Sequence, residues 1–230
     1  MNPNTLFGVS SVLCFSLPIL VIVLFRLYRH TSLIALMLYY GLTIVHCLTA
    51  ESIPPVPTFT NPWDVVYSFV EIPLVLSSLL FFCHMRQRRQ LMQKVLVGFV
   101  VYELAIALYV KFSPESSVYI MAPGLAIVVG YTTFLFLRQA KFTIFHNGKN
   151  IGRVLMLGAI LFAYGSYALV FYTYFIQKSP DIYTVYSLYF VSSTVASVLM
   201  SAGLFMMRHR IKELQELKVV RKELQMVFGS

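Results

Sequence analysis

The sequence predicts an all-α membrane protein in which seven transmembrane helices form one bundle. Three observations support this fold class. Of the 230 residues, 58% are hydrophobic and only 12% are charged, the apolar residues gather in seven long runs, and the basic residues cluster between those runs. A soluble domain usually carries about 25% charged residues, and one of this size cannot bury so much apolar surface. We therefore expect lipid to be the solvent for most of the chain.

Each apolar run is close to the length that a transmembrane helix needs, about 20 residues. Helices are expected because lipid offers no hydrogen-bond partner to unpaired backbone groups. The second and fourth runs are short, so their helices should extend into the flanking polar residues. The first run is followed by the basic segment RLYRH and has no basic residues before it, which favours a retained span over a cleaved signal peptide. The predicted spans are Phe7–Phe25, Ser32–Leu48, Val65–Cys83, Val95–Val110, Val118–Leu137, Val154–Ile176 and Tyr183–Met207.

The basic residues predict the orientation of the chain. All but two of the 18 lysine and arginine residues fall on one side of the predicted spans, and the exceptions are Lys111 and Lys178. Basic loops stay in the cytoplasm, so we expect the N-terminus outside and the C-terminus inside. The net charge of +9 could suggest that the protein binds nucleic acid. The lysine and arginine residues lie in short clusters between the apolar runs, however, and this placement argues against that partner.

The predicted organisation is a seven-helix transmembrane bundle over residues 1–207 and a basic amphipathic cytoplasmic helix over residues 208–230. In the second part, Leu217, Val220 and Leu224 begin a 3–4–3 apolar spacing that Val227 completes. This helix could lie on the anionic inner leaflet of the membrane. Alternatively, it could start a parallel coiled coil, which would imply a homodimer or a cytoplasmic signalling partner.

Three ionisable residues inside the spans are functional candidates, because a charged group near the bilayer centre costs about 2.5–3.5 kcal/mol on insertion scales. They are His46, Glu71 and Glu103. At 1.5 Å per residue, Glu71 and Glu103 should lie about 10 Å below the outer boundary and His46 about 5 Å below it. All three are therefore expected in the outer half of the membrane.

Tyrosines and a further acidic residue are predicted in the same layer. Asp64, Tyr67 and Glu71 share one helix face by their spacing. This pattern indicates either a polar pocket open to the outside or a hydrogen-bonded cluster that fixes helix packing, with interfacial tyrosines as anchors. The predicted ligand-binding residues are His46, Asp64, Tyr67, Glu71, Tyr102, Glu103, Tyr167 and Tyr186.

Signatures of enzymes and metal sites are missing from the sequence. It contains no HExxH, no GxSxG and no phosphate-binding glycine loop. Because His46 is the one clear intramembrane histidine, we expect neither a bis-histidine haem nor a three-histidine metal site. Cys14, Cys47 and Cys83 lack zinc spacing and are interpreted as apolar packing residues. No catalytic residue is predicted.

The layout of spans resembles that of the microbial rhodopsins, but the seventh run, Tyr183–Met207, contains no lysine and so excludes a covalent retinal. Four segments carry a closer resemblance: NPWDVVYSFVEIPLVLSSLLFF, VGYTTFLFLRQA, LGAILFAYGSYALVFYTYF and SLYFVSSTVASVLMSAGLF. By these segments the chain is similar to an uncharacterised family of seven-helix membrane proteins from Bacteroidota. The resemblance implies a topology but no mechanism. We expect a multi-pass protein of the bacterial inner membrane.

These features predict a receptor-like or sensor-like membrane module. It would bind a small ligand or a proton in an outer-half pocket around Glu71, Glu103 and His46, and the seventh helix would pass the change to the tail. Two alternatives stay open at this point. One is a small proton-linked transporter that uses the same carboxylates, and the other is an intramembrane lipid-modifying enzyme in which Glu71 and Glu103 act as an acid/base pair.

Overall fold

The computed structural model describes residues 3–51, 62–83, 85–110, 113–145, 150–177 and 182–228. Within these ranges the chain is helical and contains no strand, which confirms the predicted all-α class. Two short 3-10 segments, η1 (Leu27–Arg29) and η2 (Leu80–Phe82), and a π-helical turn, η3 (Tyr172–Ile176), accompany the long helices. The long helices are α1 (Pro3–Leu24), α2 (Thr31–Glu51), α3 (Pro62–Leu79), α4 (Arg86–Val110), α5 (Pro114–Phe145), α6 (Ile151–Phe171) and α7 (Ile182–Phe228).

Six of the described helical segments are long and apolar enough to cross a membrane, and a shorter apolar segment, Val9–Leu24, lies in α1. The chain is therefore a multi-pass helical membrane protein, while the crossing by α1 stays a prediction. The helices of the second and fourth runs extend into polar flanks as expected, since α2 begins at Thr31 and α4 at Arg86. The six segments are Thr31–Thr49, Val65–Phe82, Arg86–Val110, Glu115–Phe145, Ile151–Phe171 and Ser187–Ile211.

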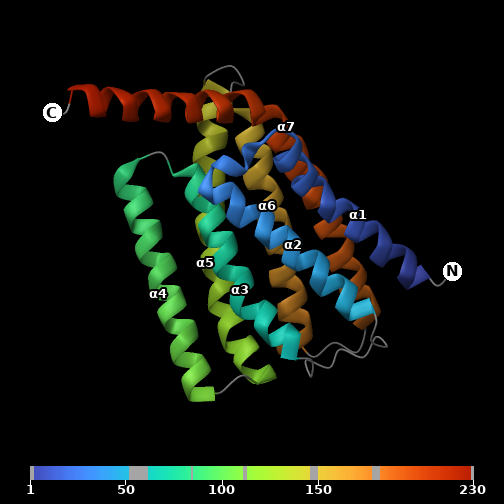
Figure 1. Cartoon of the computed structure of the whole chain (residues 1–230). Coiled ribbons are helices and arrows are strands. Elements are labelled where there is room, and N and C mark those ends of the chain that lie inside the picture. The colour runs from blue at the N-terminus through green and yellow to red at the C-terminus, as the bar shows by residue number, and fades with distance from the viewer. Residues whose placement is uncertain are drawn as a thin grey trace.

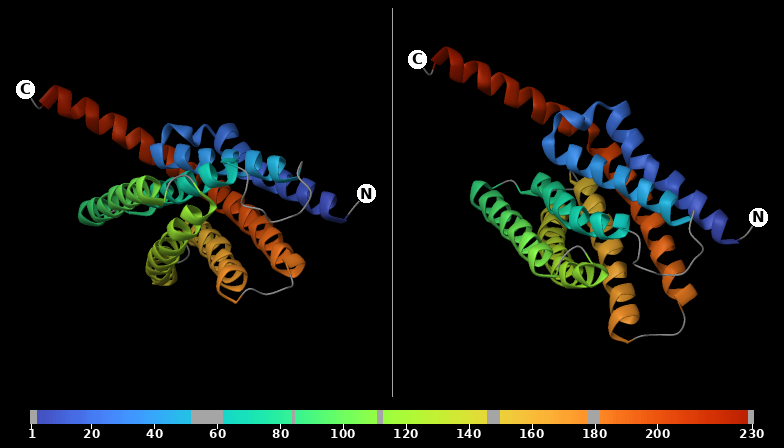
Figure 2. Two further views of the ribbon diagram at one scale, coloured as in Figure 1. Left: turned by 90° about the horizontal axis from the view of Figure 1, so that it is seen from below. Right: turned by 60° about the horizontal axis from the view of Figure 1, so that its bottom comes forward.

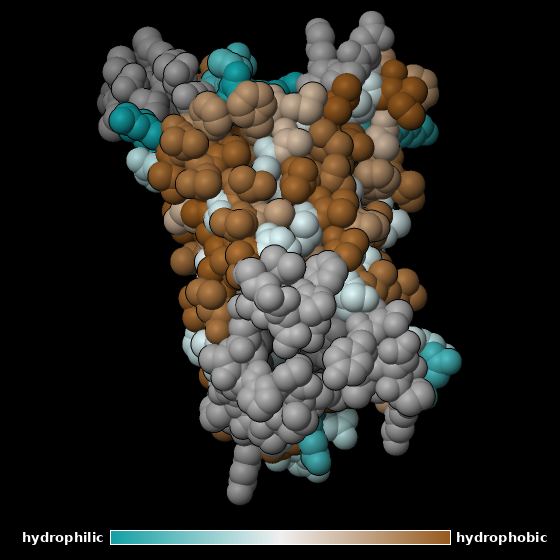
Figure 3. All heavy atoms as spheres, turned by 90° about the vertical axis from the view of Figure 1, so that its right-hand side faces the viewer, coloured by the Kyte–Doolittle hydropathy of each residue, from teal (hydrophilic) through white to brown (hydrophobic). Residues whose placement is uncertain are grey.

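The flanks of the bundle expose many large apolar side chains. Among the residues drawn in colour on the face in Figure 3, hydrophobic ones predominate in the middle of the molecule and the most hydrophilic ones lie toward its ends. A soluble monomer rarely exposes so large a continuous apolar surface, and lipid would cover it without cost. Examples of these exposed residues are Leu13, Leu20, Val97, Leu104, Leu137, Phe162, Leu188 and Val195.

The helices form a closed ring with one helix outside it. α1 packs against α2 and α7, and the ring continues through contacts of α2 with α3, α3 with α5, α5 with α6 and α6 with α7. α4 packs on the outside against α3 and α5, at the edge of the bundle in Figures 1 and 2. The interior of the bundle is apolar, with fully buried side chains at Ile72, Leu76, Met156, Met200 and Leu204.

The contact between α6 and α7 is the most extensive in the fold. The two backbones touch where Gly152 meets Gly203, because a Cβ at Gly203 would lie 2.7 Å from the Gly152 carbonyl oxygen. Small residues allow transmembrane helices to approach this closely. Glycine is therefore required at this crossing for close packing rather than for an unusual backbone angle.

Among the described residues, the exposed lysine and arginine residues belong to segments at one end of the bundle, where α1, α3 and α5 end and α2, α4 and α6 begin (Figure 1). At this end the Arg208 guanidinium lies over the rings of Phe205 and Phe25, at 3.7 and 5.0 Å from their centroids. This cation–π contact joins α7 to the end of α1. The arrangement agrees with the charge asymmetry of the sequence, while the assignment of this end to the cytoplasm stays a prediction.

α7 continues as a helix far beyond the bundle. Its 47 residues correspond to about 70 Å at 1.5 Å per residue, more than twice the hydrocarbon thickness of about 30 Å. Figures 1 and 2 show its C-terminal part extending past the end at which α4 begins. The predicted helix over residues 208–230 is therefore present over most of its length.

Candidate functional site

Glu71 of α3 is a buried carboxylate that is only half satisfied. Its side chain is 3% exposed. The Tyr164 hydroxyl of α6 donates a hydrogen bond to Glu71 Oε1 at 2.8 Å, whereas Oε2 is buried and has no hydrogen-bond partner among the described residues. Buried carboxylate oxygens in proteins normally accept a hydrogen bond. Oε2 is therefore an acceptor that suits a proton, a water molecule or a cation.

The local backbone of α3 is also unusual at this level. Pro73 lies inside the helix, two residues after Glu71. A proline in a helix interior has no amide hydrogen and removes one backbone hydrogen bond. The turn that carries Glu71 is therefore held by fewer backbone bonds than a regular helical turn.

A small cavity adjoins Glu71. Its volume is about 10 Å³ and its walls are mostly polar, which is roughly the space that one water molecule needs. The lining comes from four helices of the ring, so the site lies inside the bundle. The lining residues are Tyr39, Glu71, Ala163, Tyr164, Tyr167, Tyr189 and Ser193.

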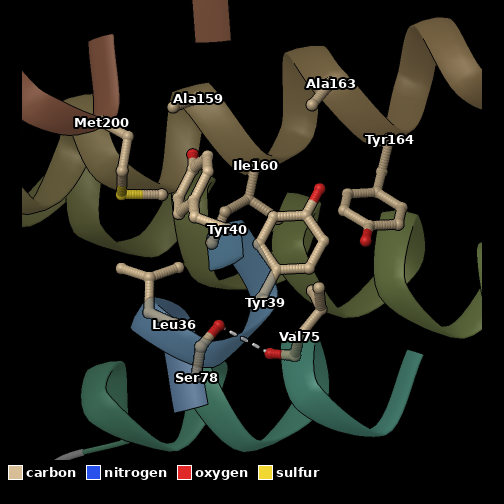
Figure 4. A pocket seen from close by; sticks show the side chains of 10 residues that line it. All are labelled: Leu36, Tyr39, Tyr40, Val75, Ser78, Ala159, Ile160, Ala163, Tyr164 and Met200. Carbon is tan, nitrogen blue, oxygen red and sulfur yellow. Dashed lines mark hydrogen bonds between the residues drawn. The ribbon is translucent and has the colours of Figure 1, made fainter. Parts of the chain in front are cut away.

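A second cavity of about 20 Å³ lies deeper in the bundle and shares Tyr39, Ala163 and Tyr164 with the first. Figure 4 shows the rings of Tyr39 and Tyr164 side by side, one from α2 and one from α6, and their centroids are 6.4 Å apart. The Ser78 hydroxyl in its wall already donates to the Val75 carbonyl at 2.7 Å. Its walls are mostly apolar, and apolar cavities of this kind stay dry.

Buried apolar side chains lie on the side of the second cavity that faces the basic end. Leu33, Leu79 and Leu204 follow the cavity-lining residues of their helices toward that end, and each is at most 1% exposed. Buried apolar side chains disfavour water and ions at their positions. On these three helices, the described residues that follow the second cavity toward the basic end therefore begin with an apolar side chain.

Two of the predicted site residues form a neighbouring contact rather than part of the cavity wall. The His46 ring stacks on Tyr67, with centroids 4.2 Å apart and an interplanar angle of 6°. The hydroxyl oxygens of Tyr67 and Thr43 are 3.0 Å apart and share a hydrogen bond. His46 and Tyr67 thus join α2 to α3 one helical turn from Glu71.

Glu103 lies apart from this site. It is 4% exposed, and its Oε1 has no hydrogen-bond partner within the described ranges. No ion pair or hydrogen bond in the described part of the chain joins it to Glu71, because α4 lies outside the helix ring. Tyr102 beside it is exposed and donates to the Tyr119 carbonyl at 2.9 Å. The structure therefore does not bring Glu71, Glu103 and His46 around one cavity.

Of the predicted residues, Glu71 and Tyr167 line the cavity. The side chains of Asp64 and Tyr186 lie outside the described residues. Tyr189, which the sequence places in the same layer as Tyr186, also lines the cavity, whereas the prediction missed Tyr39, Tyr164 and Ser193 as lining residues. Helical spacing could have indicated Tyr164, because it lies three residues from Tyr167 and so shares its helix face.

Within the described residues, no group of three or more His, Cys, Asp or Glu side chains could hold a metal ion. Comparison with known proteins found no matching family model, no matching curated protein and no matching solved structure. The resemblance to the Bacteroidota membrane proteins therefore stays a prediction from the sequence.

Proposed function

We propose that this protein is a sensor-like membrane module whose ligand is a proton taken up by Glu71. The observation that carries the proposal is a buried carboxylate with one unsatisfied oxygen beside a polar cavity of about 10 Å³. A cavity of this volume has no room for an organic ligand, which favours the proton among the small ligands considered. An ionised carboxylate at this depth costs several kcal/mol more than a neutral one, so uptake of a proton changes the stability of the surrounding packing.

The same site contacts the helix that leaves the bundle. Tyr189 and Ser193 of α7 line the Glu71 cavity, and α7 continues without a break to Phe228. Tyr164, which bonds Glu71, belongs to α6, and α6 makes the most extensive contact with α7. If these helices have two alternative arrangements that bind the proton with different affinities, proton uptake shifts the population toward one of them. Such a shift would move the tail.

A proton-linked carrier is the second candidate function. The observation in its favour is the deeper cavity, which shares the lining residues Tyr39, Ala163 and Tyr164 with the Glu71 cavity. We place the sensor first because the Glu71 cavity is lined by residues of α7, the helix that continues beyond the bundle. The lipid-modifying enzyme required Glu71 and Glu103 to act as a pair, and their separation removes the reason for it.

The decisive experiment is a pH series of thermal unfolding in detergent between about pH 5 and 8, where perturbed carboxylates and histidine titrate. We expect the midpoint temperature of the wild type to depend on pH, and Glu71→Gln to remove most of that dependence. Glu103 is also a buried carboxylate with an unpartnered oxygen within the described ranges, so Glu103→Gln measures its own contribution to the profile. Histidine ordinarily titrates in this range as well, so His46→Gln measures any contribution of His46. Parallel profiles for wild type and Glu71→Gln would overturn the proposal.

The groups that face Glu71 make this experiment interpretable. They are the phenols of Tyr39 on α2, Tyr67 on α3, Tyr164 and Tyr167 on α6, and Tyr189 on α7. Phenols ordinarily titrate near pH 10 and stay neutral below pH 8. A pH-dependent difference between wild type and Glu71→Gln in this range therefore reports on Glu71 itself.

We further propose that the protein lies in a bacterial inner membrane with its basic end in the cytoplasm, and that the C-terminal part of α7 rests on the anionic inner leaflet. The exposed basic residues at this end and the course of α7 past α4 support this placement (Figure 1). A coiled coil with a second copy or a cytoplasmic partner is the alternative.

An environment-sensitive dye at Leu217→Cys, an exposed position, tests the placement of the tail in reconstituted full-length protein. We expect a blue shift in nanodiscs that contain anionic lipid, none in zwitterionic nanodiscs, and reversal by salt. A dye at Glu115→Cys, exposed at the other end of the bundle, is the control. Concentration-dependent dimers without any lipid response would support the coiled coil instead.

A further inference from the structure

The cavity beside Glu71 presents oxygen atoms as its polar ligands. The carboxylate is surrounded by hydroxyl-bearing side chains from three other helices: Tyr39, Tyr164, Tyr167, Tyr189 and Ser193. Carboxylate and hydroxyl oxygens are hard ligands, which bind alkali and alkaline-earth cations rather than soft metals. The chemistry of the wall is therefore that of a site for a hard cation.

The charge of the site limits the cation to a single positive charge. Glu71 is the one carboxylate in the lining, and its Oε2 is buried and unsatisfied within the described part of the chain. A monovalent cation would leave the cavity neutral, whereas a divalent cation would leave a net positive charge in a medium of low dielectric constant. The remaining lining side chains are neutral phenols, a serine and an alanine.

The size of the cavity limits the cation further. A volume of about 10 Å³ is close to the minimum for one water molecule. Sodium and lithium ions are smaller than a water molecule, whereas a potassium ion is about as large and needs longer distances to its oxygen ligands. Sodium is the more abundant of the two smaller ions.

We propose that Glu71 and the surrounding hydroxyl oxygens form a sodium site, in which Na⁺ and a proton compete for the same carboxylate. The ionised Glu71 would bind Na⁺ through Oε2, and protonation of Glu71 would release it. This inference rests on the proposed function, because it adds a second ligand to the proton-binding residue. No covalent step is involved, and charge balances because one cation replaces the other.

The test uses the purified full-length chain in detergent. Its thermal midpoint is measured against pH in NaCl, KCl and choline chloride at equal ionic strength. We expect NaCl to stabilise the wild type relative to choline at pH 8 and to lose this effect as the pH falls to 5. For one-to-one competition, each tenfold rise in Na⁺ above its dissociation constant lowers the midpoint of the pH response by about one unit. Glu71→Gln should abolish the Na⁺ effect, and Glu103→Gln should retain it.

A second variant keeps the test decisive if Glu71→Gln does not fold. Ser193→Ala removes one lining hydroxyl and should raise the Na⁺ concentration needed for half-maximal stabilisation. Equal midpoints in sodium and choline at every pH, equal stabilisation by potassium, or a sodium effect that persists in Glu71→Gln would each overturn the sodium site. If sodium has no effect but the pH dependence still requires Glu71, the proton-sensing function stands alone. If both effects are absent, both proposals fail.

Discussion

The hydrogen bond from Tyr164 to Glu71 joins α6 to α3 across the interior of the ring, and Tyr164→Phe isolates its contribution. The substitution removes the donor and leaves Glu71 Oε1, at 2.8 Å in the wild type, without its partner. An unsatisfied buried acceptor costs about 1–3 kcal/mol. For a soluble domain of this size, 1 kcal/mol shifts the midpoint of thermal unfolding by about 2–4 °C. We therefore expect Tyr164→Phe to lower the midpoint by about 2–12 °C.

A matched control and a double-mutant cycle make this prediction specific. Tyr102 also donates one hydrogen bond, to the Tyr119 carbonyl at 2.9 Å. It is exposed, so water or detergent headgroups can replace that bond, and Tyr102→Phe should cost less than about 1 kcal/mol. In the cycle, Glu71→Leu removes the acceptor together with its charge. The double variant Tyr164→Phe/Glu71→Leu should lose less than the sum of the two single variants, because no orphaned polar atom of the pair remains.

The measurement is thermal unfolding of all four variants and the wild type, followed by fluorescence in one detergent at one pH. Two results would refute the reasoning. One is an equal loss for Tyr164→Phe and Tyr102→Phe. The other is a coupling energy between Tyr164 and Glu71 below about 0.5 kcal/mol, the limit within which independent sites add.

Two further predictions concern packing and topology. Gly203→Ala should lower the unfolding midpoint, because a Cβ there lies 2.7 Å from the Gly152 carbonyl oxygen and overpacking costs about 1–3 kcal/mol. Gly98→Ala, with no atom within 4 Å of the new Cβ, should instead gain up to about 1 kcal/mol of helix propensity, and equal effects would contradict the packing argument. In a chain without its native cysteines, Glu115→Cys should react with an impermeant thiol reagent in intact cells and Lys141→Cys should not; the reverse pattern would invert the proposed orientation.

The sequence by itself determined the class of the fold and the approximate limits of its helices. Hydropathy and length are properties of each segment alone, so runs such as Val65–Cys83 could be recognised without knowing their neighbours. The short fourth run could likewise be expected to extend toward Arg86, where α4 in fact begins. Basic residues could be assigned to one end because alternate loops of an antiparallel bundle lie on the same side.

The tertiary structure alone decided which polar residues meet. Helical rise gives the depth of Glu71 and Glu103, but not the direction in which each side chain points or the order of the helices around the bundle. That order depends on contacts between distant segments, such as Gly152 with Gly203, and it leaves α4 outside the ring. The partner of Glu71 is therefore Tyr164, 93 residues away in the chain, because residues at equal depth contact each other only when their helices are neighbours and face one another.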